Sequence, residues 1–571
     1  MPDWSKKTWS VEVPVDHIDP PVPGRGYEKC SPRQEILPAG WNGFKSKALT
    51  SDILVDHDVS WQVRDGATLY ADVYRPPHTD EKVPALICWS PFAKKFNGIT
   101  SLQVMTYANL GIPDGTLSGL EKFEGPDPAD WCPRGYAIIN VDVRGTGDSE
   151  GIMAVLGSQE GEDGYDTVEF FAKQPWCNAS QRPPSLTAIA PWEGCGDLYR
   201  EQFARGGIWA GDMYEKIIKK YMLRGHHGTE GMKAMFDKHP LANDWWNDKR
   251  PDMKNINVPT YITGTWSNTM HGMGAIRGWL EVDTPDKWLR WHPWQEWYDL
   301  WGNKQAVPEL MQFFDHYLKG ADNGWEKTPK VRMGVLKFGK SKPLENVVEK
   351  DFPIPRTQYR KAYLQPGNKL SLESTPSNPQ TVEYDSTKSE SYASFTHTFD
   401  KTTQIVGMSK AILYMSCDDL DDMDIFIMLR KLDKDGKPML ALNVPWEGLP
   451  VTEFDQIPKE GATEVILYAG PTGILRASLR AIDWDKTMHE NWPFYPQDKE
   501  EKIQHSKVVR LEIGIWATGI EFEAGERIRF QVAGTPQGLL NFPMTDHVKN
   551  KGIHKIHVGG QYDSHVVLPF T

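Results

Sequence analysis

The apolar pattern of this chain changes at about residue 329, and that change limits the folds that the chain can adopt. Before this point, apolar runs such as Tyr136–Val143 and Val258–Gly264 alternate with helical patterns such as Glu160–Lys173. Strands separated by helical segments indicate βαβ units and a mostly parallel sheet. After this point, short alternating segments separated by turn residues indicate a β-sandwich. At 571 residues the chain is also longer than a single core supports, so we expect several domains.

Several segments of the first part have the pattern of a particular element. Residues apolar at every second position come before the run Ala85–Trp89: Val59, Trp61, Val63, then Leu69, Ala71, Val73. Alternation followed by a continuous apolar run predicts a hairpin that leads into a buried strand. Trp288–Trp291 has the pattern of a further strand, and Pro308–Leu318 that of a helix that ends at Lys319 and Gly320.

The second part contains the strand candidates of the sandwich. They are the segment Val331–Val335, then Ala411–Met415, Ile425–Leu429, Arg527–Val532 and the closing Ser564–Pro569. Asp433–Gly436 has the composition of a tight turn between two of these strands. We expect this part to form a domain of its own.

Composition excludes several classes of protein. The net charge of −13 disfavours nucleic acid or an anionic membrane surface as the main partner. Six scattered cysteines lack metal-ligand spacing and are too few for a disulfide framework in so long a chain. There is no run of about 18 apolar residues and no apolar core of a signal peptide near Met1. We therefore expect a cytoplasmic protein that acts on a small molecule, with no membrane partner; its oligomeric state stays open.

Five blocks of the chain resemble one family of enzymes in their order and spacing. They are Val141–Gly151, Gly164–Phe170, Gln174–Asn178, Leu186–Pro191 and Asp197–Glu201. The chain resembles the serine hydrolases of the cocaine esterase / Xaa-Pro dipeptidyl-peptidase (CocE/NonD) family. The resemblance implies an α/β class fold, with an α/β-hydrolase core, a helical cap and a C-terminal jelly roll of the galactose-binding-like kind. Its implied boundaries are an extension (1–45), core (46–204), cap (205–255), core (256–328) and jelly roll (329–571).

One part of the family pattern is absent. The family places a strand, a turn of the G-x-S-x-G kind with the nucleophilic serine, and the start of a helix after the third block. Here Trp176–Pro184 runs straight through that place. Ser149 lies in a literal G-x-S-x-G, but the sequence after Gly151 does not lead directly into a helix, so a structural serine is expected. Ser180 adjoins the junction but lacks the flanking glycines.

The other catalytic positions that the resemblance implies also depart from the family pattern. Phe92 stands where the family has the tyrosine of the oxyanion hole, whose loss as a donor costs ~2.7–4 kcal/mol of transition-state stabilisation. Asn268 stands in the place of the acid and cannot stabilise an imidazolium by charge. Glu296 stands in the place of the base, and His292 is an alternative base. We expect Trp89, Trp266 and His271 to line the pocket.

No cofactor is expected. The acidic segment Asp419–Asp424 lacks the glycine and glutamate spacing of a calcium loop, so we expect solvated charge there and no metal site. Three functions stay open. The chain is a family hydrolase for esters or amides, impaired because one segment was lost; or a pseudoenzyme that binds ligands; or a tailoring enzyme for a bulky apolar metabolite, without an acyl-enzyme. A mis-assigned intron in the gene would explain the lost segment.

Overall fold

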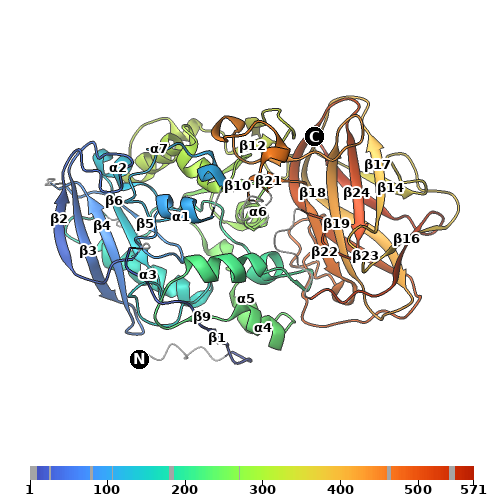
Figure 1. Ribbon diagram of the computed structural model, residues 1–571, viewed down its shortest axis with the longest axis horizontal. Coiled ribbons are helices and arrows are strands. Elements are labelled where there is room, and N and C mark those ends of the chain that lie inside the picture. Colours follow the sequence, from blue (N-terminus) through green and yellow to red (C-terminus); the bar gives the residue numbers. More distant parts are fainter. Residues whose placement is uncertain are drawn as a thin grey trace.

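A computed structural model describes residues 9–24, 27–77, 81–105, 107–178, 185–268, 270–458, 465–538 and 547–571. An N-terminal α/β part and a C-terminal β part lie side by side (Figure 1). The junction 179–184, which includes Ser180, falls outside the described residues. The two-part architecture predicted from the change of pattern at residue 329 is confirmed, as an α/β-hydrolase core followed by a β-sandwich.

The first sheet contains five strands in the order β2-β3-β4-β6-β5. The strands are β2 (Arg33–Leu37), β3 (Ile53–Gln62), β4 (Thr68–Arg75), β5 (Ala85–Cys88) and β6 (Ala137–Asp142). β3 and β4 form the predicted antiparallel hairpin, and β5 pairs with β6 in parallel. Because β2 belongs to the N-terminal extension, part of this extension forms the edge strand of the first sheet.

The second sheet contains four strands in the order β10-β11-β12-β13. They are β10 (Thr260–Thr265), β11 (Lys287–His292), β12 (Val331–Val335) and β13 (Leu344–Glu349); the first three run parallel. Residues 187–192 continue this sheet beyond β10 through parallel bridges of Ile189 to Thr260 and of Trp192 to Thr263. The strands predicted at Val258–Gly264 and Trp288–Trp291 are confirmed.

Among the described residues, no strand joins the two sheets. β5 is the last strand of the first sheet, with Cys177 bridged to Val83 just before it, and the segment 187–192 ends the second. The segment uses Ile189 and Pro191 to bond β10, so by alternation the backbone groups of Ala188 and Ala190 point to its other side. Both ends line one cavity of about 950 Å³. Residues 179–184, where the family pattern predicts a further strand, lie outside the described residues.

Helices cover both sheets. The larger ones are α3 (Ser158–Ala172), α6 (Gly272–Glu281) and α7 (Ala306–Lys319). α7 ends, as predicted, at Gly320, whose φ of 67° is readily adopted only by residues such as glycine. Further helices lie in the part of the sequence that connects the two sheets. They are η4 (Leu198–Phe203), η5 (Tyr214–Met222), α4 (Met232–Lys238) and α5 (Asp244–Asp248).

Shorter elements connect these parts. They are β1 (Val15–Asp16), α1 (Gly98–Met105), η2 (Tyr107–Gly111), α2 (Pro128–Trp131), η3 (Cys132–Arg134), β7 (Ala204–Arg205), β8 (Ile208–Trp209), β9 (Thr229–Glu230), η6 (Met253–Asn255), η7 (Tyr298–Gly302) and η8 (Trp325–Lys327). β1 pairs with β9 and so holds the N-terminal extension against the helical region. No helix in the described part of the chain has the length and apolar character needed to cross a membrane.

The C-terminal part is built from β14 to β26. Its strands are β14 (Gln358–Gln365), β15 (Lys369–Ser371), β16 (Gln380–Asp385), β17 (Tyr392–Thr398), β18 (Thr403–Cys417), β19 (Asp424–Leu432), β20 (Ala441–Leu442), β21 (Leu467–Tyr468), β22 (Thr472–Arg476), β23 (Val509–Phe522), β24 (Arg527–Ala533), β25 (Ile553–Val558) and β26 (His565–Phe570), with short helices η9 (Trp446–Gly448), η10 (Phe454–Gln456) and η12 (Ala477–Leu479). β18 pairs with β23 along most of its length, and β26 joins β18 to β14. Four of the five strands predicted for the sandwich and the Asp433–Gly436 turn are confirmed. The fifth, Val331–Val335, is a strand, but as β12 it pairs with β11 in the second sheet and does not belong to the sandwich.

One expectation for this part is wrong. Asp422 and Asp424 of the acidic segment are buried, not solvated. Asp424 forms a paired contact with Arg476 at 2.7 and 3.0 Å, and Asp422 accepts hydrogen bonds from the backbone of Ser478 and from Lys502. These carboxylates fasten the end of β19 to β22 by charge-assisted hydrogen bonds.

Candidate active site

The cavity of about 950 Å³ lies where the two sheet ends, the helical region and the sandwich meet. Its walls are largely apolar, with Trp89 and Phe92 after β5, Phe203 and Met213 from the helical region, and Phe426 from the sandwich. A cleft of this size suits a drug-sized ligand with a large apolar surface. Most tryptophans lie elsewhere: Trp245, Trp246, Trp288, Trp291 and Trp325 are buried in the cores, as packing predicts.

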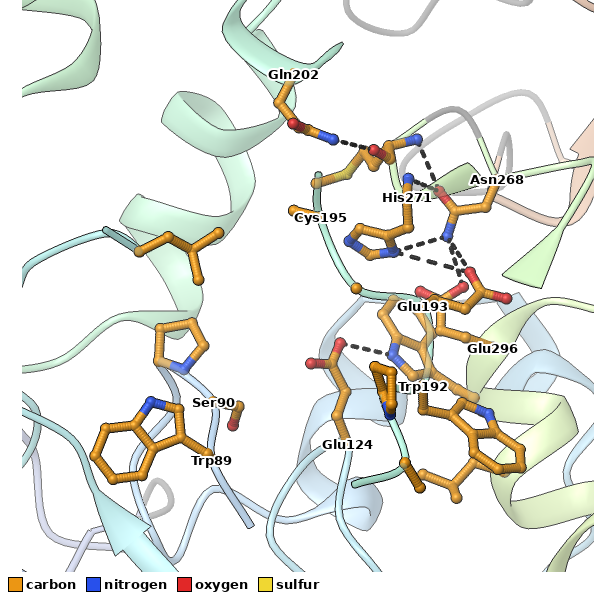
Figure 2. Close-up of a pocket in the computed structure, with 18 of the residues that line it drawn as sticks. Trp89, Ser90, Glu124, Trp192, Glu193, Cys195, Gln202, Asn268, His271 and Glu296 are labelled. Atoms are coloured by element: carbon orange, nitrogen blue, oxygen red, sulfur yellow. Dashed lines mark hydrogen bonds and ion pairs between the residues drawn. The ribbon is translucent and has the colours of Figure 1, made fainter. Parts of the chain in front are cut away.

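Four polar side chains meet on one wall of this cavity (Figure 2). Glu193 follows the segment 187–192, Asn268 and His271 follow β10, and Glu296 follows β11. They come together because the carboxyl ends of parallel strands meet at the same edge of a sheet. The Asn268 Nδ2 atom lies 2.9 Å from Oε2 of Glu193, 2.7 Å from Oε2 of Glu296 and 3.1 Å from Nδ1 of His271.

The orientation of the Asn268 amide follows from its other contacts. Its Oδ1 accepts hydrogen bonds from the backbone N–H groups of Met270 (2.8 Å) and His271 (3.2 Å). The opposite end must therefore be the NH₂ group, whose two hydrogens match the two carboxylates. Asn268 thus links the loop after β10 to the ends of both neighbouring strands.

The two carboxyl groups differ in charge. Burial disfavours ionisation of Glu193, but the neighbouring imidazoles of His271 and His292 outweigh it and lower its pKa to about 2. Burial and the neighbouring Glu193 charge raise the pKa of Glu296 well above its usual value. Burial opposes a charge on His271, yet Cys195, Glu193 and Glu296 outweigh it and raise its pKa. The wall therefore combines a carboxylate, a protonated carboxyl and an imidazolium, which can exchange protons with a ligand.

A third carboxyl group lies nearby. Glu124 Oε1 accepts a hydrogen bond of 3.0 Å from Nε1 of Trp297, and both residues line the cavity. Burial raises the pKa of Glu124, although the bond from Trp297 acts in the opposite direction. It adds a second proton donor to the polar wall.

His292 does not lie on the cavity wall. It is buried at the end of β11, with Nε2 3.0 Å from Oε1 of Glu193 and 3.5 Å from Oδ2 of Asp299. Its ring contacts Glu193 on the side away from the cavity. His292 is therefore not placed to act as a base that contacts substrate. Glu296, the other candidate for the base position, does line the cavity.

Of the other residues predicted to lie at the site, two line the cavity and one does not. Phe92 and Trp89 line the cavity, and Phe92 packs edge-on against Phe123 without offering a hydroxyl donor. Trp89 Nε1 donates to Glu160 at 2.8 Å. Trp266 does not line the cavity; it packs on Trp291, and its Nε1 donates to the Gly334 carbonyl, because the loop after β10 turns its ring towards the second core.

The described serines near the site lack a histidine partner. Ser149 is buried, and its Oγ donates to the Asp142 carbonyl at 2.7 Å and accepts from the Tyr70 N–H at 3.1 Å. Ser149 is thus a structural serine. Three serines line the cavity: Ser90, Ser185 and Ser267. In the part of the chain described, none of the three hydrogen-bonds a histidine, which a serine nucleophile requires.

The donor atoms of Glu193, His271 and Glu296 lie within 4.8 Å of one another, a spacing that could hold a metal ion. The Nδ2 atom of Asn268, however, lies at hydrogen-bond distance from all three residues. A cation would need the position that this NH₂ group fills. The residues present therefore do not fit a metal ion.

Sequence reasoning missed Glu193, Glu124 and Cys195. A usable signal existed for Glu193: it is a charged residue directly after the apolar segment Leu186–Pro191 and Trp192, at the end of a predicted strand. Its φ of 61° is unusual for a residue other than glycine and is typical of functional turns. No local pattern distinguished Glu124 or Cys195.

Comparisons with known proteins agree with this architecture. Residues 323–567 match the family model of the X-Pro dipeptidyl-peptidase C-terminal non-catalytic domain, and residues 65–180 match that of X-Pro dipeptidyl-peptidase (S15 family). Cocaine esterase from Rhodococcus sp. (strain MB1 Bresler) is 21% identical over 90% of this chain and 98% of its own length.

Solved structures give the same picture. A CocE/NonD family hydrolase from Staphylococcus aureus superposes with a TM-score of 0.81 at 26% identity, covering 96% of this chain and 98% of its own. An α-amino acid ester hydrolase superposes with a TM-score of 0.63 at 15% identity, covering 91% and 97%, and so shares the fold.

Proposed function

Because the chain belongs to the CocE/NonD family of α/β-hydrolases, we propose that it binds a carboxylic ester or amide with a bulky apolar acyl or aromatic group. We further propose that this chain does not hydrolyse its ligand through a serine. The observation that carries the proposal is the pairing of an apolar cavity with the polar wall formed by Glu193, Asn268, His271 and Glu296. The cavity would take the apolar group, and the wall would face the carbonyl.

The lack of serine chemistry rests on two observations. The hydroxyl of Ser149 is engaged on both sides by backbone groups, and the cavity serines lack a histidine partner among the described residues. Acyl transfer by a serine needs an adjacent base, because the hydroxyl alone is a weak nucleophile. Phe92 also offers no hydroxyl to a developing oxyanion.

A second candidate function is acid–base catalysis on a bulky apolar metabolite without an acyl-enzyme. The protonated Glu296 on the cavity wall favours it, since a neutral carboxyl group donates a proton or a hydrogen bond at neutral pH. His271, 3.1 Å from the Asn268 amide, would take or return the proton. A pseudoenzyme that only binds is the limiting case in which neither chemistry occurs.

Fluorescence titration tests ligand binding, since Trp89, Trp192 and Trp297 line the cavity. A naphthyl ester should quench the tryptophan emission and bind at least ten times more tightly than methyl acetate. Trp89→Ala should weaken binding several-fold. Trp484→Ala, at an exposed tryptophan outside the lining, is the matched control and should leave binding unchanged. Equal affinity of the two esters, or equal loss in both variants, would rule the proposal out.

Fluorophosphonate labelling tests the absence of serine chemistry. After incubation, mass spectrometry of the intact protein should show no adduct. A stoichiometric adduct on Ser149 or on a cavity serine would show that this chain is an ordinary serine hydrolase.

A further inference from the structure

A half-buried cysteine lies on the same cavity wall. Cys195 comes two residues after Glu193, between Gly194 and Gly196, and lines the cavity. Figure 2 shows it beside the His271 ring, on the side away from Asn268. Cys195 is also among the groups that raise the pKa of His271. The chain thus places a thiol against an imidazole at the carboxyl end of a strand.

The other side of the imidazole is held by polar groups. Nδ1 of His271 lies 3.1 Å from Nδ2 of Asn268 and 3.8 Å from Oε2 of Glu193. Nδ1 thus faces Asn268 and Glu193, which leaves Nε2 on the side of the thiol. Cys195, His271 and Glu193 are thus arranged in space in the order nucleophile, base and carboxylate that orients the base.

We propose that Cys195 is an acyl-accepting nucleophile in this chain, with His271 as its base and Glu193 as a positioning residue. The proposal rests on the ligand class proposed above, carboxylic esters with a bulky apolar acyl group, and adds the atom that would react. Cys195 lies between two glycines, and the serine motifs of the sequence gave no indication of a nucleophile at this position.

The reaction would run in two balanced steps. The thiol proton passes to Nε2 of His271, and the thiolate attacks the ester carbonyl to form a carbon–sulfur bond. The carbon–oxygen bond of the ester breaks, and the alcohol leaves with the proton from His271. A water molecule then gives a proton to His271 and attacks the thioester, which releases the carboxylic acid and returns the proton to the thiol. The sum is ester plus water giving acid plus alcohol.

The electrostatics support this arrangement. The raised pKa of His271 means that its surroundings stabilise the positive charge that it gains when it takes a proton. The ionised Glu193 stabilises the same imidazolium. Thiolate is the form that alkylating agents attack, so a base beside the thiol should speed its alkylation.

The chain provides its own control. Of its six cysteines, all free, only Cys30 and Cys195 are half-buried, and the other four are buried. Burial and the Asp58 charge raise the pKa of Cys30. Cys30 should therefore react as a slow thiol whose rate rises steeply with pH.

Iodoacetamide alkylation of the wild-type protein, followed by peptide mapping, is the test. Cys195 should react at least ten times faster than Cys30 at pH 7. His271→Gln should slow Cys195 at least ten-fold and leave Cys30 unchanged. If Cys195 reacts no faster than Cys30 in the wild-type protein, the proposal is wrong; this comparison needs no variant to fold.

Acyl transfer is tested separately. Incubation with a naphthyl thioester should add one acyl group to Cys195, removable by hydroxylamine, in wild type and in Cys30→Ser but not in Cys195→Ala. Absence of the adduct while naphthyl esters still quench tryptophan emission would refute the nucleophile and leave the proposed ligand class standing. Absence of both would refute the ligand class as well.

Discussion

The amide nitrogen of Asn268 lies 2.7 Å from a carboxyl oxygen of Glu296, so two loops that follow neighbouring parallel strands are joined by one hydrogen bond. The same nitrogen reaches Glu193 at 2.9 Å on the next segment of the sheet. One amide therefore holds together the ends of three chain segments. Its two hydrogens let two buried carboxyl groups lie side by side.

Asn268→Asp should destabilise the protein. The change places a third carboxyl group beside Glu193 and Glu296 and removes the hydrogens donated to them, and each acceptor left without its donor costs ~1–3 kcal/mol. Urea denaturation at pH 7 should show a lower midpoint with a similar slope. Asn255→Asp, at an exposed position, is the control and should change stability by less than about 0.5 kcal/mol. Equal effects of the two changes would contradict the bridging role of Asn268.

Glu296→Gln should alter how stability depends on pH. The unfolded carboxyl titrates at about 4.3, whereas burial and the Glu193 charge raise the folded pKa. The folded state then binds the proton more tightly, so the contribution of Glu296 to stability is full below pH 4.3 and is lost as pH rises towards the folded pKa. The variant stays neutral throughout.

The free energy of unfolding of Glu296→Gln, minus that of wild type, should therefore increase between pH 4 and pH 8. Chemical denaturation at both pH values measures it. A difference that is constant with pH would show that Glu296 titrates normally in the folded protein.

Ser149→Ala should lower the stability of the fold without changing the reaction of the protein with esters. The Ser149 hydroxyl fixes the loop after β6 by bonding the Asp142 carbonyl and the Tyr70 N–H, so its loss should cost ~1–3 kcal/mol. Thermal unfolding measures the loss, and the thioester adduct on Cys195 reports on chemistry. Loss of the adduct in a folded Ser149→Ala protein would show that the G-x-S-x-G loop takes part in the reaction.

Restoring a strand should stabilise the fold. We expect this chain to express poorly or aggregate, because no strand of the described residues lies between β5 and the segment 187–192, and both line the cavity. A backbone group that is buried without a partner costs ~1–3 kcal/mol. A chimera that replaces 179–184 with the corresponding segment of the S. aureus hydrolase should be soluble and melt cooperatively. An equally cooperative, monomeric melt of the original chain would mean that the absence of this segment from the sequence is tolerated.

The sequence predicted the architecture well for a physical reason. The strands at Tyr136–Val143 and Val258–Gly264 are buried on both faces, so their apolar runs are long and unmistakable. The strand β2 was missed because its residues are mostly exposed and carry no such run. Edge strands leave a weak signal in composition.

The site was predictable only in part. Asn268 and Glu296 follow strands and were found by their places in the family pattern, and both line the cavity. Trp266 and His292 stand at equally good places along the chain, yet their rings turn into the cores, because side-chain direction depends on loop geometry that spacing does not encode. Cys195 was missed since its partner, His271, is distant in sequence.

The sandwich supplies part of the cavity wall, through residues such as Phe426, Met428 and Tyr468. The polar wall of the cavity thus comes from the α/β part alone, whereas the shape of the cavity depends on both parts. Substitutions in the sandwich can change the size of group that is accepted while the reacting atoms stay as they are. Selectivity and reactivity can then vary independently among proteins that share this arrangement.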